Sequence, residues 1–166
     1  PWFESSVTYE NARICQALIV TGSAIGNSQS LEIGLSSLAW LCEQHRMNEG
    51  YFQPTGTNGF HHRDGGRAVF DQQPVEAQAM VSACIEAFRA SGERTWLDEA
   101  GHAFDWFLGA NALGIPLHDA TSGGCCDGLH SDRINENQGA ESTLAFLIAA
   151  TEMAAANRPL SHIHAS

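Results

Sequence analysis

The sequence predicts an all-α protein built from repeated helical hairpins. Five segments carry apolar residues at the 3.6-residue period of an amphipathic helix, and runs of β-branched residues are few. Short links alternate with long ones between these segments, as expected when helices pair into hairpins. At 166 residues the chain is long enough for one domain with its own core. We therefore expect a single domain over residues 1–166, either complete or a fragment of a longer helical repeat.

The first hairpin is predicted over residues 8–47. Its first helix covers residues 8–21 and is expected to end at Gly22, since glycine is a common helix terminator. Leucines spaced by three or four residues predict the second helix over residues 30–47. The link between these two helices is short.

The second hairpin follows a long, glycine-rich loop over residues 48–70. Asp71 is expected to be the N-cap of the third helix, because a proline such as Pro74 is tolerated in a first helical turn. This helix is predicted to run to about Ala90. After a second short link, aromatic and apolar residues at helical spacing predict the fourth helix over residues 95–108.

A second long loop, over residues 109–137, leads to a fifth helix over residues 140–156. Part of this loop is crowded with carboxylate, amide and imidazole side chains and has no apolar periodicity. A polar segment this long is costly to order, which suggests that it forms one wall of a ligand site. His162 and His164 lie in a tail and are expected to be exposed.

The first helix of each pair begins with a similar short motif that contains a glutamate. Glu10, Glu76 and Glu141 are spaced by about 65 residues, a usual length for an elaborated hairpin repeat. Hairpins with short links at one end place every long link at the other end. We therefore expect the loop around His61 and the loop around Asp127 to face each other, beside the N-termini of the first helices.

Composition limits the partners. The formal net charge of -11 opposes binding to nucleic acid or to an anionic membrane surface, because both carry charge of the same sign. No apolar run approaches the roughly 20 residues needed to cross a bilayer. The five cysteines have no CxxC spacing, and three of them sit among apolar residues of predicted helices. This usage favours a reduced, cytoplasmic protein.

Three stretches together resemble a known superfamily. Residues 70–77 (FDQQPVEA), 106–109 (WFLG) and 123–142 (GGCCDGLHSDRINENQGAES) are similar to the (α/α) toroids of the six-hairpin glycosidase-like superfamily. More narrowly, they resemble the helical region found downstream of a glycosyltransferase module in some bacterial proteins. The resemblance implies a cytoplasmic, carbohydrate-related role, with polar loop residues at the N-terminal ends of the inner helices. A closed toroid needs about six hairpins, so five helices imply a partial toroid that a homo-oligomer or missing hairpins would complete.

Glycoside hydrolysis needs two carboxyl groups across the scissile bond, one protonated and one ionised. Two of the predicted loop–helix junctions supply acidic candidates. First-turn acids and N-caps also stabilise helices without any catalytic role. This structural role is an equal alternative for Asp71, Glu76 and Glu141. Asp127 lies between glycines in a loop, where capping explains less, so a functional role is favoured there. The catalytic candidates are Asp71, Glu76, Asp127, Glu136 and Glu141.

Other polar residues of the same two loops are candidates for binding a carbohydrate. The histidines of these loops have no HxH or HExxH spacing, so we expect neither a metal ion nor a cofactor. Of the aromatic residues, Trp2 and Tyr51 lie near loops and suit stacking on a sugar, whereas Trp40, Trp96 and Trp106 fall on helical faces and suit the core. The binding candidates are His61, Arg63, Gln73, His130, Asn135, Asn137 and Gln138.

Two functions remain open at this point. The first is a glycoside hydrolase-like enzyme that uses loop carboxylates as acid and base. The second is a non-catalytic helical module that binds a glycan or supports a partner domain such as a glycosyltransferase. Carboxyl groups roughly 5 to 10 Å apart across an open cleft would favour the enzyme, whereas buried or internally bonded carboxyl groups would favour the module.

Overall fold

Helices dominate the part of the chain that the structure, a computed structural model, describes, which is residues 2–156. The prediction of a mostly α-helical protein is confirmed, and the strands are only two residues long. His162 and His164 lie outside the described residues. The elements are β1 (Ser6–Val7), α1 (Ala12–Ile25), α2 (Ser28–His45), β2 (His61–His62), α3 (Pro74–Ser91), α4 (Thr95–Asp105), the 3-10 helix η1 (Trp106–Leu108), β3 (Gly128–Leu129), β4 (Ile134–Asn135) and α5 (Ala140–Ala156).

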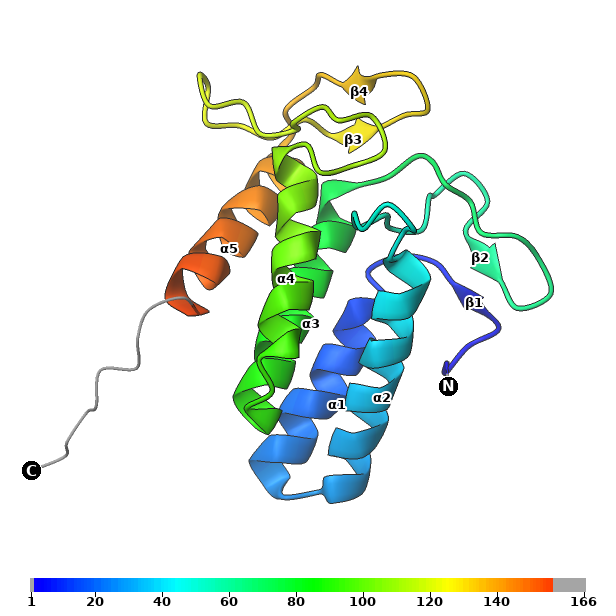
Figure 1. The fold of residues 1–166 in the computed structure, drawn as a ribbon, viewed down its shortest axis with the longest axis vertical. Helices are drawn as coiled ribbons and strands as arrows, with labels where there is room; N and C mark the ends of the chain where they lie inside the picture. The colour runs from blue at the N-terminus through cyan, green and yellow to red at the C-terminus, as the bar shows by residue number, and fades with distance from the viewer. Residues whose placement is uncertain (1, 157–166) are drawn as a thin grey trace, which may run out of the picture.

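The helices pair as hairpins around α3. Helix α1 packs on α2 and α3 packs on α4, while α3 also lies between α1 and α5 (Figure 1). Most residues of α3 are buried, because small side chains such as Ala79 and Ala83 let neighbours approach it on several sides. The first helices of the successive pairs, α1, α3 and α5, therefore form one row.

The first helix ends one turn later than predicted. Gly22 lies inside α1 and is buried, and a Cβ atom added there would lie 2.6 Å from the main-chain nitrogen of Leu31. Glycine is thus needed at this position for the close approach of α1 to α2. The helix ends instead at Gly26, whose φ of 68° is the left-handed conformation usual for a glycine C-cap. The second helix starts at Ser28. Asn27 is its N-cap, and the side chain of Asn27 accepts a hydrogen bond from the N–H of Ser30.

The predicted N-cap at Asp71 is wrong. Helix α3 begins at Pro74, and Gln73 before it is extended, as expected for a residue that precedes proline. Because Pro74 has no N–H and its φ suits a helix, the first turn needs less capping, and Asp71 is available for another partner. The fourth predicted helix is also shorter than expected, since Asp105 ends α4 and η1 follows directly.

Both long loops lie at one end of the helices and both short links at the other (Figure 1). We call the first of these ends the loop end. Gln72 and Leu129 exchange two main-chain hydrogen bonds of 2.9 Å and so join the two loops. The buried side chain of Gln72 also accepts a hydrogen bond of 2.8 Å from the indole N–H of Trp106. The segments that carry the two loops therefore meet at this junction, while His61 and Arg63 line a hollow of their own.

Candidate functional site

The three repeated glutamates come together at the start of α1, α3 and α5. The main-chain N–H of Glu10 donates a hydrogen bond of 2.6 Å to Oε1 of Glu76. The phenol of Tyr9 lies 3.2 Å from Oε1 of Glu141 and donates to it. We call Tyr9, Glu10, Glu76 and Glu141 the glutamate cluster. It joins three elements that lie far apart in the sequence.

The environments of these acidic groups differ. Burial raises the pKa of Glu76 to about 7, although hydrogen bonds from the main-chain N–H groups of Glu10 and Asn11 oppose the shift. Glu141 is exposed. Partial burial and the neighbouring Glu141 carboxylate raise the pKa of Tyr9 to about 12, so its hydroxyl keeps its proton at neutral pH. Burial therefore favours the protonated form of one carboxyl group of the cluster, that of Glu76.

Asp127 fastens the second long loop to the start of α5. Its Oδ1 accepts a hydrogen bond of 2.8 Å from the N–H of Gly139, and its Oδ2 accepts one from the side chain of Asn137. Burial opposes ionisation, but hydrogen bonds from Asn137, Ser142 and Gly139 outweigh it and lower the pKa of Asp127. These bonds give Asp127 a structural role next to any functional one.

Gln138 also forms hydrogen bonds within the second long loop. Its side-chain oxygen accepts from the hydroxyl of Ser122 at 2.7 Å, and its amide donates to Asp119 at 3.2 Å. Hydrogen bonds from Ser122, from the N–H of Thr121 and from Gln138 lower the pKa of Asp119. The amide of Gln138 is thus largely used within its own loop.

Asp71 and His130 connect the two long loops through their side chains. Nδ1 of His130 lies 2.7 Å from Oδ1 of Asp71, and both side chains are partly exposed. Gln73, two residues further, sits directly before α3 and makes no capping bond with its side chain. A carboxylate bonded to an imidazole holds the ring in one orientation. The bond to Asp71 therefore fixes the orientation of the His130 ring before any ligand binds.

The segment from His130 to Asn137 forms the wall of an open groove. The groove has a volume of about 800 Å³ and brings four of the predicted site residues together. Ile115 and Ile134 supply its apolar surface, while imidazole, amide and charged groups supply the rest. We call it the 130–137 groove, and its lining residues are Ile115, His130, Asp132, Arg133, Ile134, Asn135, Glu136 and Asn137.

His61 and Arg63 lie in a different hollow. It has a volume of about 200 Å³ and includes Trp2 and Trp40, and it shares no lining residue with the 130–137 groove. The structure thus distributes most of the predicted residues over the glutamate cluster, the groove and this smaller pocket. Asp127 and Gln138 instead hold their own loop, and Asp71 pairs with His130. Trp40, assigned to the core from its helical spacing, is instead half-buried at the surface of α2, where its ring stacks on Trp2 of the N-terminal segment. Nothing in the local sequence predicts this contact between the N-terminal segment and α2.

The cysteines give no support to a thiol nucleophile. All five are free and buried, and burial raises the pKa of Cys15 and of Cys125 to about 12. Among residues 2–156, no cluster of three or more histidine, cysteine or acidic side chains could hold a metal ion. None of the described helices combines the length and the apolar character needed to cross a bilayer.

Comparison of the sequence with protein-family models finds no match, and comparison with curated proteins finds none either.

Proposed function

We propose that this chain is a glycan-binding helical module whose ligand lies in the 130–137 groove. The observation that carries the proposal is the exposed Glu136, which has no hydrogen-bond partner among the described residues, on one wall of an 800 Å³ groove. The exposed Asn135 and Asn137 flank it, and each keeps hydrogen-bonding atoms beyond its one bond within the loop. Amides both donate and accept, and a carboxylate accepts at two oxygens, which suits the paired hydroxyls of a sugar. The apolar surface of Ile115 and Ile134 can cover the C–H faces of the same sugar.

Binding is favoured over catalysis because most candidate carboxyl groups already have partners within the protein. Asp71 bonds to His130, and Asp127 holds the start of α5. Glu76 is buried and bonded to a main-chain N–H. Glu136 remains exposed in the groove, and a single free carboxylate suits recognition better than acid–base work.

A glycoside hydrolase-like reaction is the second candidate, and the glutamate cluster favours it. Glu76, with a pKa raised to about 7, has the character of a general acid, and the exposed Glu141 has that of a base. Tyr9 contacts Glu141 and would orient that carboxylate. In this alternative the substrate lies over the N-termini of α1, α3 and α5.

We further propose that the hairpins α1–α2 and α3–α4, with α5, are consecutive parts of an (α/α) toroid. Helices α1, α3 and α5 form one row, in which Glu10 contacts Glu76 and Tyr9 contacts Glu141, and this arrangement supports inner helices of such a ring. A second copy or further hairpins would complete it. The five free cysteines support a reducing compartment, the cytoplasm.

Isothermal titration with cellotetraose, mannotetraose and xylotetraose tests the binding proposal. We expect one of these neutral tetrasaccharides to bind, and Glu136→Gln to weaken that binding about tenfold, a loss of roughly 1.4 kcal/mol. Glu32→Gln on the exposed side of α2 makes the same charge change away from the groove and is the matched control.

Reducing-end release is measured on the same samples. Turnover that Glu76→Gln abolishes would replace binding by hydrolysis as the function. Absence of binding to all three probes, or an equal loss in both variants, would overturn the groove as a glycan site.

A further inference from the structure

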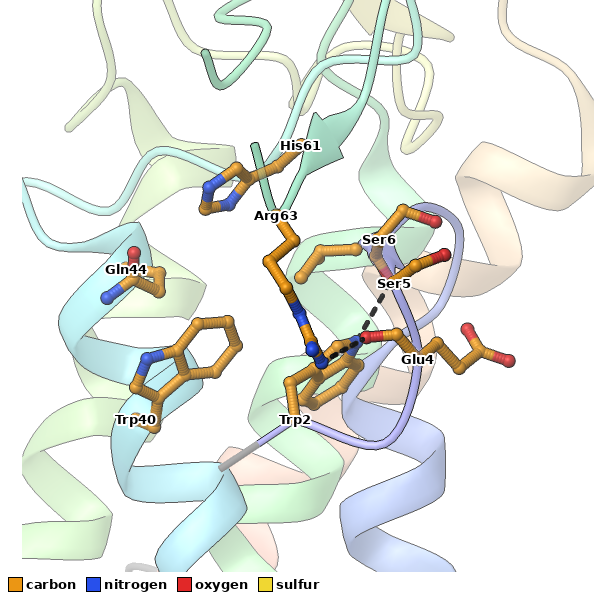
Figure 2. Close-up of a pocket in the computed structure, with 9 residues that line it drawn as sticks. Trp2, Glu4, Ser5, Ser6, Trp40, Gln44, His61 and Arg63 are labelled. Atoms are coloured by element: carbon orange, nitrogen blue, oxygen red, sulfur yellow. Dashed lines mark hydrogen bonds between the residues drawn. The ribbon is translucent and has the colours of Figure 1, made fainter. Parts of the chain in front are cut away.

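We propose that a second site, separate from the groove and the glutamate cluster, binds a sugar unit that carries a carboxylate, such as a hexuronic acid. The site is the 200 Å³ hollow between the N-terminal segment, α2 and the β2 segment (Figure 2). We call it the Trp2–Trp40 pocket. Trp40 and Gln44 on α2 form one side and residues 2–7 form the other, with His61 and Arg63 between them.

Two indole rings give the pocket an aromatic surface. The rings of Trp2 and Trp40 stack with centroids 5.5 Å apart and planes 27° apart. The indole N–H of Trp2 donates to the carbonyl of Ser6 at 2.9 Å, which holds this ring against its own segment. Extended aromatic surfaces are large, rigid and amphipathic, and the C–H face of a pyranose packs well on them. A volume of about 200 Å³ equals that of roughly seven water molecules and admits about one hexose ring.

Arg63 supplies a positive charge with no carboxylate partner. Its main-chain N–H donates to the carbonyl of Ser5 at 2.9 Å, so the residue is fixed beside the N-terminal segment. Its guanidinium donates only a long bond of 3.5 Å to the carbonyl of Glu4, and within residues 2–156 it forms no ion pair. The carboxylate of Glu4 points away from Trp40 (Figure 2). A guanidinium left free in this way can pair with a ligand carboxylate through two bonds.

His61 adds a polar group that lacks a partner. Its Nδ1 is buried and has no hydrogen-bond partner among the described residues. Buried polar atoms are normally satisfied, so an unpaired one beside a pocket points to a bound group. Burial, together with the charges of Arg67 and His62, lowers the pKa of His61, so the ring is neutral at pH 7 and can bond a sugar hydroxyl.

Arg67 strengthens the preference for an anion. Its guanidinium donates to the carbonyls of Gln44 and Gln53 and forms no ion pair among the described residues. Arg63 lines the pocket, and Arg67 lies behind it, next to the lining residues Gln44 and His61, in a chain whose net charge is -11. That overall charge disfavours a polyanion, whereas a single carboxylate meets a locally positive site. An aromatic surface, a free guanidinium and a neutral imidazole together match a hexuronic acid.

The four tryptophan indole N–H signals in a ¹H–¹⁵N correlation spectrum make the test specific, with Trp40→Phe to assign the Trp40 signal. The probes are D-glucuronate, D-glucose and benzoate, added to the full chain. We expect glucuronate to shift the signals of Trp2 and Trp40, while those of the buried Trp96 and Trp106 stay in place. We expect glucose to bind at least about tenfold more weakly, because it lacks the carboxylate.

The outcomes separate the parts of the proposal. Glucose binding as tightly as glucuronate would overturn the role of Arg63, and benzoate binding as tightly would overturn the assignment to a sugar. No shift of Trp2 or Trp40 would overturn the pocket. Arg63→Gln, at an exposed position, should weaken glucuronate binding about tenfold. Arg89→Gln makes the same change on the exposed end of α3 and should leave glucuronate binding unchanged. An equal loss of glucuronate binding in both variants would reject the site.

Discussion

The main-chain N–H of Glu10 donates a 2.6 Å hydrogen bond to the carboxyl group of Glu76, a residue that is only 4% exposed. The pair joins the N-termini of α1 and α3. Because the carboxyl group is buried, its ionisation opposes folding, and its protonated form is the stable one at acidic pH.

The first prediction concerns Glu76 and pH. Its pKa is raised from 4.5 to about 7, so the folded state binds more protons than the unfolded state between these values. Its contribution to stability therefore falls as pH rises from 4.5 to 7 and is constant above. Glu76→Gln removes the cost of burying an ionised carboxylate. We therefore expect the free energy of unfolding of the variant to exceed that of the wild type by roughly 3 kcal/mol at pH 8 and by little at pH 4. Urea unfolding at both pH values measures it. A constant difference between the two proteins would contradict the assignment.

The second prediction concerns Asp127. Because its carboxylate accepts from the N–H of Gly139 at the start of α5, Asp127→Asn should cost about 1 kcal/mol of stability. Asp132→Asn is the control, since Asp132 is exposed and pairs only with its neighbour Arg133; we expect a change within about 0.5 kcal/mol. Thermal unfolding of both variants decides. Unchanged stability combined with lost glycan binding would restore Asp127 as a direct ligand contact.

The third prediction compares two helical glycines. A Cβ atom at Gly22 would lie 2.6 Å from the nitrogen of Leu31, whereas one at Gly101 would meet nothing within 4 Å. Gly22→Ala should therefore destabilise the protein by about 1 to 3 kcal/mol, because α1 and α2 must separate. Gly101→Ala should stabilise it by about 0.5 to 1 kcal/mol through helix propensity. Denaturant midpoints that move in the same direction would show that the α1–α2 contact is looser than described.

The fourth prediction concerns the junction of the two loops. Gln72→Leu leaves the indole N–H of Trp106 buried without its acceptor, which should cost about 1 to 3 kcal/mol. Gln73→Leu changes a neighbouring side chain that makes no capping bond, and we expect a change within about 0.5 kcal/mol. Urea titration followed by tryptophan fluorescence measures both. Similar losses would mean that the Trp106 bond contributes nothing specific.

The fifth prediction is self-association. Leu144, Leu147 and Ile148 lie on one side of α5 and are 55%, 47% and 43% exposed. Adjacent exposed apolar residues of this size favour a protein contact. We expect oligomers at micromolar concentration by light scattering, and a shift toward monomer in the double variant Leu144→Lys with Leu147→Lys. A wild-type chain that stays monomeric up to high concentration would refute the prediction.

Local sequence predicted the number and order of the helices, although the end of α1, the start of α3 and the end of α4 lie elsewhere. The boundaries of α5 agree with the predicted residues 140–156, since its apolar content is high and a polar loop ends directly before it. The recurrence of Glu10, Glu76 and Glu141 predicts an internal repeat, and the structure places these residues at the N-terminal ends of α1, α3 and α5.

Tertiary structure decided which side chains meet. Gly22 could not be recognised as a contact glycine rather than a terminator, because its neighbour Leu31 belongs to the next helix. Asp71 bonds to His130, 59 residues away, and so is not a cap. The separation of the groove from the Trp2–Trp40 pocket also depends on how the loops fold over the helix ends. Helical periodicity is a local property, whereas the partner of a loop side chain is set by contacts between distant segments, which no local pattern contains.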